Sequence, residues 1–319
     1  MHGVIRDRPA SQVPPEFWTD VTNAQVRDGG MLTSPGSVER IVDPGDRVHF
    51  LINTRGASSW WVYCTDTGIY QTDGASGPTN IATTLTPANF SLTGAPWKAS
   101  ECSGGLLHNI PYILCGDNPP VYWPQTGNCV ETTNWSTYGS ASGQAGVLWT
   151  FWNHVFAGDV QGEETSVAWT DAVDPSSPAA DWAASTTNEA GQVYLSDTSG
   201  AIMQGLSIGR SCAIYKPHST YLADYIGGNQ VFAFRLLSRE LGLLARHAVC
   251  DIGGRHVVLA DDDIVMHDGR EVVSIAAGSI RRELFSRISG DHLLESWAVF
   301  HRPQREVWIC VPTDGNAVP

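Results

Sequence analysis

The stretch at residues 246–269, R-H-A-V-C-D-I-G-G-R-H-V-V-L-A-D-D-D-I-V-M-H-D-G, contains the pattern that decides the fold. An apolar run at 256–260 is followed by an acidic turn at 261–263, and a second apolar run at 264–267 ends in Asp-Gly. Two short runs joined by a tight polar turn are typical of paired antiparallel strands. The stretch therefore predicts a strand, a turn and a second strand.

The same design recurs along the chain from residue 46 onward. We mark each unit by one position in an apolar run, and these positions are Trp61, Tyr112, His154, Cys212, His256 and Glu306. Successive markers are 42 to 58 residues apart, close to the roughly 40–50 residues of a propeller blade. Each blade of such a fold is a short antiparallel sheet that packs face to face on its neighbours around a channel.

These units predict an all-β chain, a β-propeller of about six blades. If the repeat is real, the residues that follow the markers occupy equivalent strands of successive blades: Val62, Ile113, Val155, Ala213, Val257 and Val307. A β-sandwich is the alternative, because it is also built from short strands with frequent turns. Six similar units favour the propeller.

Residues 1–45 differ from the rest and are predicted to form an extended N-terminal arm, with the propeller at 46–319. The arm is rich in proline, which central strands exclude, and we expect one helical turn around residues 16–22 and a tight turn at 26–30. The last unit stops after its turn, so either the arm supplies a strand that closes the ring or the natural protein continues. One short helix is expected at 279–288, where the apolar residues follow a helical period.

Composition limits the functional classes. Of the 319 residues, 42% are hydrophobic and 16% charged, and the formal net charge is −14, so the chain is expected to fold rather than to be disordered. An acidic chain does not hold nucleic acid by neutralising phosphates, which needs clustered Lys and Arg. No apolar run approaches the roughly 20 residues of a membrane span, and the N-terminus has no apolar signal-peptide core.

The seven cysteines are odd in number, and no two form C-x-x-C. Several lie in or at the end of apolar runs, as buried reduced thiols in strands do. A zinc site or a disulfide framework is the alternative, and a reducing compartment fits best.

No catalytic motif is present. The carboxylates of 261–263 and Asp268 could bind calcium, but the EF-hand spacing is absent and an acidic turn explains them. The histidines form no H-E-x-x-H, and no G-x-S-x-G elbow, P-loop or G-x-G-x-x-G occurs. Paired carboxylates could hydrolyse sugars, yet any chain with 33 acids offers such pairs. We expect no enzyme, no catalytic residue, no cofactor and no metal.

Tryptophans could form a surface on which sugars stack, but most lie in strand runs, where aromatic side chains fill the interfaces between blades. Core packing is therefore the expected role of Trp60, Trp61, Trp123, Trp149, Trp152, Trp169 and Trp182.

Three segments carry a resemblance to a known family. Residues 14–30, P-P-E-F-W-T-D-V-T-N-A-Q-V-R-D-G-G, resemble the opening of bacteriophage virion proteins of the short-tail nozzle and head-stabilisation type. A second similarity runs from W-N-H-V-F-A-G-D at 152–159 through S-V-A-W-T-D at 166–171 to D-W at 181–182. A third is D-D-D-I-V-M-H-D-G at 261–269, followed by an Arg-Arg pair.

The resemblance implies a structural virion protein: a tail nozzle subunit in a ring of self-associated copies, expected to be a hexamer, below the head-to-tail adaptor. Its partners would be that adaptor and other tail proteins, and DNA would pass through without specific binding. The protein would be assembled in the host cytoplasm and located in the virion tail. The chain is short for this family and ends within a blade. The alternatives are a propeller binding module that recognises a host glycan or partner protein and a propeller glycoside hydrolase.

Overall fold

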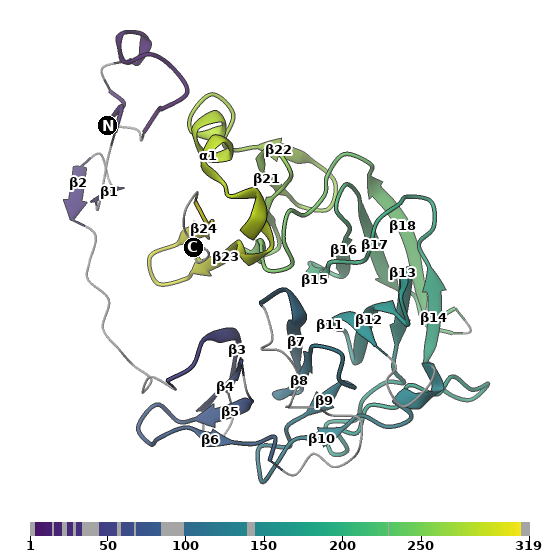
Figure 1. The fold of residues 1–319 in the computed structure, drawn as a ribbon. Coiled ribbons are helices and arrows are strands. Elements are labelled where there is room, and N and C mark those ends of the chain that lie inside the picture. The colour runs from purple at the N-terminus through teal and green to yellow at the C-terminus, as the bar shows by residue number, and fades with distance from the viewer. Residues whose placement is uncertain are drawn as a thin grey trace.

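The structure, a computed structural model, describes residues 4–14, 16–20, 24–27, 30–33, 45–55, 59–66, 68–83, 99–138, 144–228 and 230–313. In these ranges six antiparallel sheets follow one another around a common axis (Figure 1). The protein is a six-bladed β-propeller. Five blades have four strands each, and the sixth has two among the residues described.

Each blade is a run of consecutive strands. Blade 1 has β3 (Val48–Arg55), β4 (Ser59–Thr65), β5 (Ile69–Thr72) and β6 (Thr79–Asn80); blade 2 has β7 (Cys102–Leu107), β8 (Ile110–Cys115), β9 (Val121–Tyr122) and β10 (Val130–Glu131). Blade 3 has β11 (Ala145–Phe151), β12 (His154–Val160), β13 (Glu163–Trp169) and β14 (Gly191–Tyr194); blade 4 has β15 (Gln204–Ile208), β16 (Ser211–Tyr215), β17 (Thr220–Tyr225) and β18 (Phe232–Ser238). Blade 5 has β19 (Val249–Asp251), β20 (His256–Leu259), β21 (Ile264–His267) and β22 (Val272–Ser274); blade 6 has β23 (Trp297–His301) and β24 (Glu306–Cys310).

The predicted repeat is confirmed. The six residues that follow the unit markers all lie in the second strand of a blade, in β4, β8, β12, β16, β20 and β24. This strand is the easiest to recognise because the blades on either side bury it, as in β20, whose four residues are all buried. The first strands lie around the centre of the ring (Figure 1).

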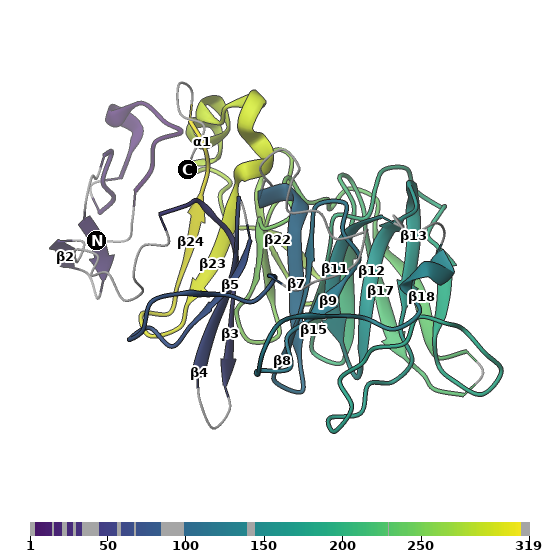
Figure 2. The same ribbon diagram turned by 60° about the horizontal axis from the view of Figure 1, so that its bottom comes forward.

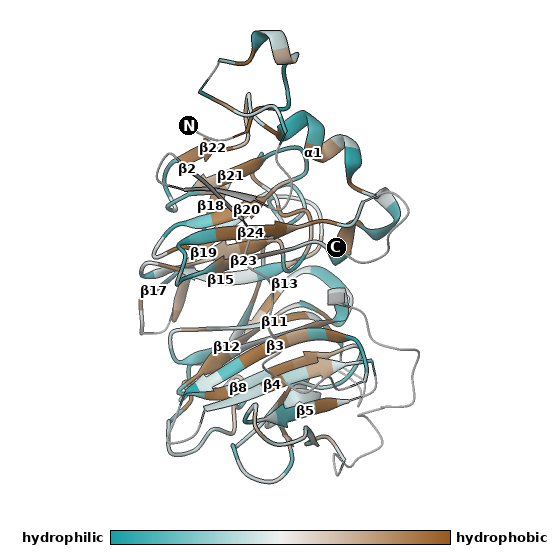
Figure 3. Ribbon diagram, turned by 90° about the vertical axis from the view of Figure 1, so that its left-hand side faces the viewer, coloured by the Kyte–Doolittle hydropathy of each residue, from teal (hydrophilic) through white to brown (hydrophobic). Residues whose placement is uncertain are grey.

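Apolar side chains fill the interfaces between blades, and hydrophobic residues concentrate in the strands (Figure 3). Separate clusters lie between blades 1 and 2, 2 and 3, and 3 and 4, and a fourth spans blades 4, 5 and 6. Among the described residues none joins blade 6 to blade 1. Instead, an ion pair of 3.4 Å connects Arg47, just before blade 1, to Glu295, just before blade 6.

Blade 6 therefore has two unlike faces. Alternate residues of its two strands, Phe300 and Val307 among them, pack on the cluster of blade 5. The opposite face exposes Trp297, Val299 and Trp308, and Val299 lies directly opposite Trp308 in the ladder. This apolar face has no partner blade in the structure described.

Two residues in the segment between β18 and β19 reach across the propeller to blade 2. Arg246 donates to the carbonyl of Ser100, in the 3₁₀ turn that precedes β7, and its Nε donates to Met203 O at 3.2 Å. His247 Nε2 lies 2.9 Å from Cys102 O, and the amide of Ala298 in blade 6 donates to His247 O at 2.8 Å. Blades 2 and 5 are opposite in a ring of six, so these contacts tie opposite sides together.

The described part of the arm lies outside the ring (Figure 2). Ile5 donates its amide to Trp18 O, and the amides of Arg6 and Asp7 both donate to Ser279 O. The Asp7 carboxylate accepts the amides at the start of α1 (Arg281–Arg287), at 3.3 and 3.2 Å.

Helix α1 lies within the predicted segment 279–288, and its predicted apolar face packs on the cluster that spans blades 4, 5 and 6.

The helical turn expected around 16–22 is wrong for the residues described there. Trp18 is paired in parallel with Val4 instead, and the one-turn η1 (Ala10–Gln12) precedes it. Further 3₁₀ turns are η2 (Ala99–Glu101), η3 (Trp135–Tyr138) and η4 (Gly290–Glu295).

The arm also contains a hairpin, β1 (Ala24–Arg27) and β2 (Gly30–Thr33), at the predicted tight turn. Its ladder joins only these two strands, so the described part of the arm adds no strand to blade 6. In Figure 1 the hairpin stands apart from the blades, on the side of blade 6.

A buried hydrogen-bond network links blade 4 to blade 5. The Tyr215 hydroxyl lies 2.7 Å from His256 Nδ1 and 2.5 Å from His267 Nε2, and all three residues are buried. Burial lowers the pKa of both imidazoles, and the neighbouring His256 helps to lower that of His267 to about 4. Both histidines are therefore neutral in the folded protein at pH 7.

This network predicts a pH dependence of stability. Below the ordinary histidine pKa of 6.5 the unfolded chain takes up protons that the folded chain does not, so stability falls between pH 6.5 and about 4. His267→Gln should remove a loss on the order of 2 kcal/mol from that window, measured by urea unfolding against pH. His218→Gln, at an exposed position, is the control. An unchanged slope in His267→Gln would contradict the assignment.

Candidate functional site

The acidic turn at 261–263 has a structural role, since its carboxylates pair with an arginine of α1. Residues 261–263 connect β20 to β21, and Arg281 Nη2 lies 2.5 Å from the Asp262 carboxylate and Nη1 3.8 Å from that of Asp263. Asp268 lies at the opposite end of β21, where its carboxylate accepts the amides of Arg270 and Glu271. The structure does not bring these carboxylates together as ligands of one cation.

Of the seven tryptophans that were expected to pack in the core, four are buried. Trp123, Trp149, Trp169 and Trp182 are buried, and Trp60 and Trp61 are half-buried. Trp152 is the exception, because it lies in the turn between β11 and β12 and is 52% exposed. Its ring stacks on Tyr225 with centroids 5.3 Å apart.

A groove of about 710 Å³ lies between the outer strands of blades 3 and 4. It is lined by residues 185–193, Trp169, Gly228, residues 230–232 and Phe234. Glu189 is the one acidic residue in this lining. Its carboxylate lies 3.1 Å from His154 Nε2 and accepts the Tyr225 hydroxyl at 3.2 Å. Burial lowers the pKa of His154. The groove can hydrogen-bond a polar ligand, but it lacks the second carboxylate that glycoside hydrolysis uses.

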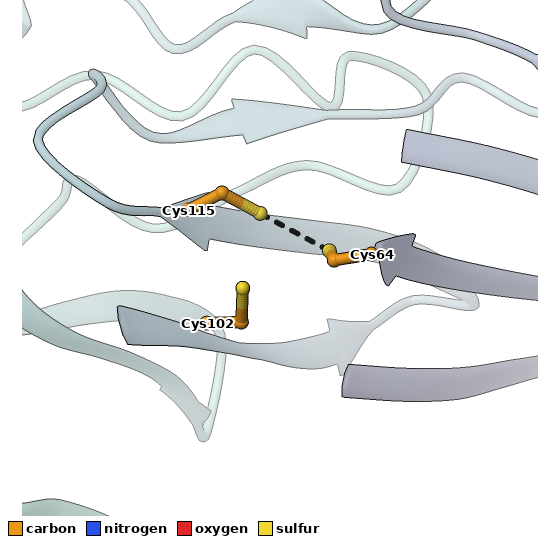
Figure 4. Close-up of side chains that lie close together, drawn as sticks. All are labelled: Cys64, Cys102 and Cys115. Carbon is orange, nitrogen blue, oxygen red and sulfur yellow. Dashed lines mark hydrogen bonds between the residues drawn. The ribbon is translucent and has the colours of Figure 1, made fainter. Parts of the chain in front are cut away.

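Three cysteines gather at the interface between blades 1 and 2 (Figure 4). Cys64 lies on β4, Cys102 begins β7 and Cys115 ends β8, where it pairs directly with Cys102. The three Sγ atoms lie within 4.8 Å of one another, and Cys64 Sγ is 3.1 Å from Cys115 Sγ. All three residues are buried.

The surroundings shift the pKa values of the three thiols in different directions. Hydrogen bonds from the thiols of Cys115 and Cys64 lower the pKa of Cys102, and the nearby imidazoles His49 and His247 lower it further. Burial raises the pKa of Cys64 and of Cys115 well above the ordinary value. The surroundings thus shift the pKa of Cys102 in the direction opposite to that of Cys64 and Cys115.

His49 lies on β3, at a register shift between Val48 and Phe50, and its imidazole is close enough to Cys102 to act on it electrostatically. Such a bulge turns a side chain out of the regular alternation of the strand. The His49 side chain is 2% exposed, and its Nε2 bonds to the Asp66 carboxylate. Its Nδ1 is buried with no hydrogen-bond partner among the described residues.

The sequence predicts buried reduced thiols, but the spacing between these three cysteines gives no indication that they meet. One signal was present: Cys64 and Cys115 each stand three positions after a unit marker. Equivalent positions on the second strands of neighbouring blades can meet at their interface.

Comparisons with known proteins identify no family. No family model matches the chain, and no curated protein matches it. Among solved structures, it is similar to the extracellular domain of the hybrid two-component system BT4673 from B. thetaiotaomicron, with TM-score 0.43 and 8% identity over 83% of this chain. The chain spans 37% of the length of that structure.

Two further structures are similar at the same TM-score of 0.43 and at 10% identity. The AfRom2 CNH domain aligns with 84% of this chain and 86% of its own, and YCF48 bound to D1 peptide aligns with 85% and 77%. No helix in the described part of the chain is long and apolar enough to cross a membrane.

Proposed function

We propose that this protein is a structural subunit of a bacteriophage tail nozzle, in which copies form a ring below the head-to-tail adaptor. The arm carries the proposal. Residues 14–30 resemble the opening of such proteins, and the part of the arm described lies outside the propeller with its hairpin unpaired to any blade. An external arm with a free hairpin is suited to reach a neighbouring copy.

Blade 6 offers a second contact surface. Strand β24 ends its sheet among the described residues, and an unpaired strand edge presents backbone donors and acceptors to another chain. Beside it lie the exposed side chains of Trp297, Val299 and Trp308. Apolar side chains next to a free sheet edge favour association.

The DNA conduit would lie between copies. Arg246 and His247 reach across the propeller and bond to Ser100 and to Cys102, which is incompatible with a duplex on the propeller axis. Each propeller would instead be one segment of a larger wall, with the ring of copies enclosing the lumen.

The net charge of −14 per copy suits such a lumen. Basic contacts to phosphates would add salt-dependent affinity and slow the passage of DNA. An acidic wall repels the duplex over about 8 Å at physiological salt and keeps it centred.

A propeller binding module for a host glycan or partner protein is the second candidate. The groove between blades 3 and 4, with the Glu189 carboxylate and the nearby stacked pair Trp152–Tyr225, favours it. Glycan-array binding by a chain that stays monomeric would support this candidate over the first.

Deleting residues 1–30 should impair assembly more than folding. Asp7→Ala should act in the same direction, because it removes the carboxylate that holds the arm to α1, a loss of about 1 kcal/mol. Ring formation is measured by sedimentation and folding by thermal unfolding. Glu16→Ala, an exposed acid of the same arm, is the matched control. Rings that persist in the deletion variant would count against the role of the arm.

The assembled ring should not bind duplex DNA at moderate salt, because its lumen is expected to be net acidic, with the 19 Lys and Arg mainly outside or at subunit contacts. Fluorescence anisotropy with a labelled duplex, repeated across a salt series, measures this. Tight binding that weakens steeply with salt would show a basic surface in contact with DNA and contradict the account.

A further inference from the structure

The cysteine cluster has the dimensions of a metal site. Zinc–sulfur bonds of about 2.3 Å in a tetrahedron place the sulfur atoms roughly 3.8 Å apart. The Sγ atoms of Cys64, Cys102 and Cys115 all lie within 4.8 Å of one another, and those of Cys64 and Cys115 are 3.1 Å apart. Small rotations of side chains would bring all three sulfurs to equal distances from one ion.

The ligand type also suits a metal. A thiolate is the metal-binding form of cysteine. Binding of one divalent ion would displace the protons of the three thiols to solvent and form three metal–sulfur bonds. Three thiolates are soft ligands and favour zinc over calcium or magnesium.

His49 is the candidate for the fourth ligand. Its ring nitrogens do not lie within 4.8 Å of all three sulfur atoms, so its side chain would move when the metal binds. His49 is buried, and its Nδ1 has no hydrogen-bond partner among the described residues, while its Nε2 bonds to the Asp66 carboxylate. Metal-binding histidines characteristically donate the other ring N–H to a carboxylate, which fixes the ring orientation. An unpartnered buried nitrogen is costly, and coordination would remove that cost.

We propose that Cys64, Cys102 and Cys115 bind one zinc ion between blades 1 and 2, with His49 as the fourth ligand and Asp66 as the carboxylate that orients it. The site has a structural role, because it joins β3 and β4 of the first blade to β7 and β8 of the second. Blade 1 has an apolar cluster on its blade 2 side only among the described residues, so this interface bears most of its attachment. The proposal does not depend on the function proposed above.

The test begins with the full chain purified under reducing conditions without chelator. Elemental analysis should find about one zinc per chain, and X-ray absorption at the zinc edge should find three sulfurs and one nitrogen. Cobalt should replace the zinc and give the sulfur-to-metal charge-transfer absorption of thiolate coordination. Removing the metal with a chelator should lower the melting temperature, and adding zinc should restore it.

Variants assign the ligands. Cys102→Ser should lower zinc affinity at least about tenfold, whereas Cys212→Ser, at a buried thiol between blades 3 and 4, should keep the wild-type metal content. His49→Gln should weaken binding by about tenfold or more while the cobalt charge-transfer absorption remains. Unchanged affinity in His49→Gln would overturn the assignment of the fourth ligand.

The wild-type measurements keep the proposal falsifiable if Cys102→Ser does not fold. A folded, reduced chain that contains no zinc and takes up neither zinc nor cobalt would overturn the site. A Cys64–Cys115 disulfide in the chain as purified under reducing conditions, with an S–S bond of about 2.05 Å, would overturn it as well, because the two sulfurs would then not be free to bind zinc.

Discussion

The contacts that Arg246 and His247 make across the propeller are the constraint on which the rest of the structure depends. A propeller ring is stable when every blade packs on two neighbours, but here no apolar cluster joins blade 6 to blade 1 in the part of the chain described. His247 compensates, because it contacts Cys102 O of blade 2, Ala298 N of blade 6 and the ring of Phe50 in blade 1. One segment at the centre thus touches the blades on both sides of the break.

Blade 6, with two strands among the residues described, is where the surfaces open to a partner are found. A closed ring of complete four-stranded blades would hide its sheet edges, and its loops would be the main binding surface. Among the residues described, this chain instead presents an unpaired β24 edge, an apolar face on blade 6 and an external arm that contacts α1. The same break makes the blade 1–2 interface important for holding blade 1 in place, and three thiols meet at that interface.

Sequence reasoning predicts the blades well because the second strand of each is mostly apolar or aromatic. It misses most of the first strands, since an inner strand such as β7, C-S-G-G-L-L, is rich in small residues where backbones approach closely. At Gly104 an added Cβ would lie 2.2 Å from Tyr112 O, so close packing dictates glycine and removes the apolar signal. Short outer strands such as β6 and β10 carry too few residues to show a period.

The candidate site was harder to predict than the fold for a related reason. Metal motifs are recognised by short spacings, but Cys64, Cys102 and Cys115 are brought together by contact between blades, which a linear pattern does not encode. The position of His49 depends on a bulge, which shifts the alternation of β3 by one residue. Trp152 was expected in the core because it adjoins β12, yet it falls in the turn before the strand begins.

The central claim is that the propeller works as one segment of a ring of copies. Electron cryomicroscopy of the purified full-length chain at high concentration tests it most directly. The account predicts closed rings whose lumen is bounded by several propellers, with each propeller axis blocked by its own residues. Single propellers without ring contacts, or a duplex-sized channel along the axis of one propeller, would contradict it.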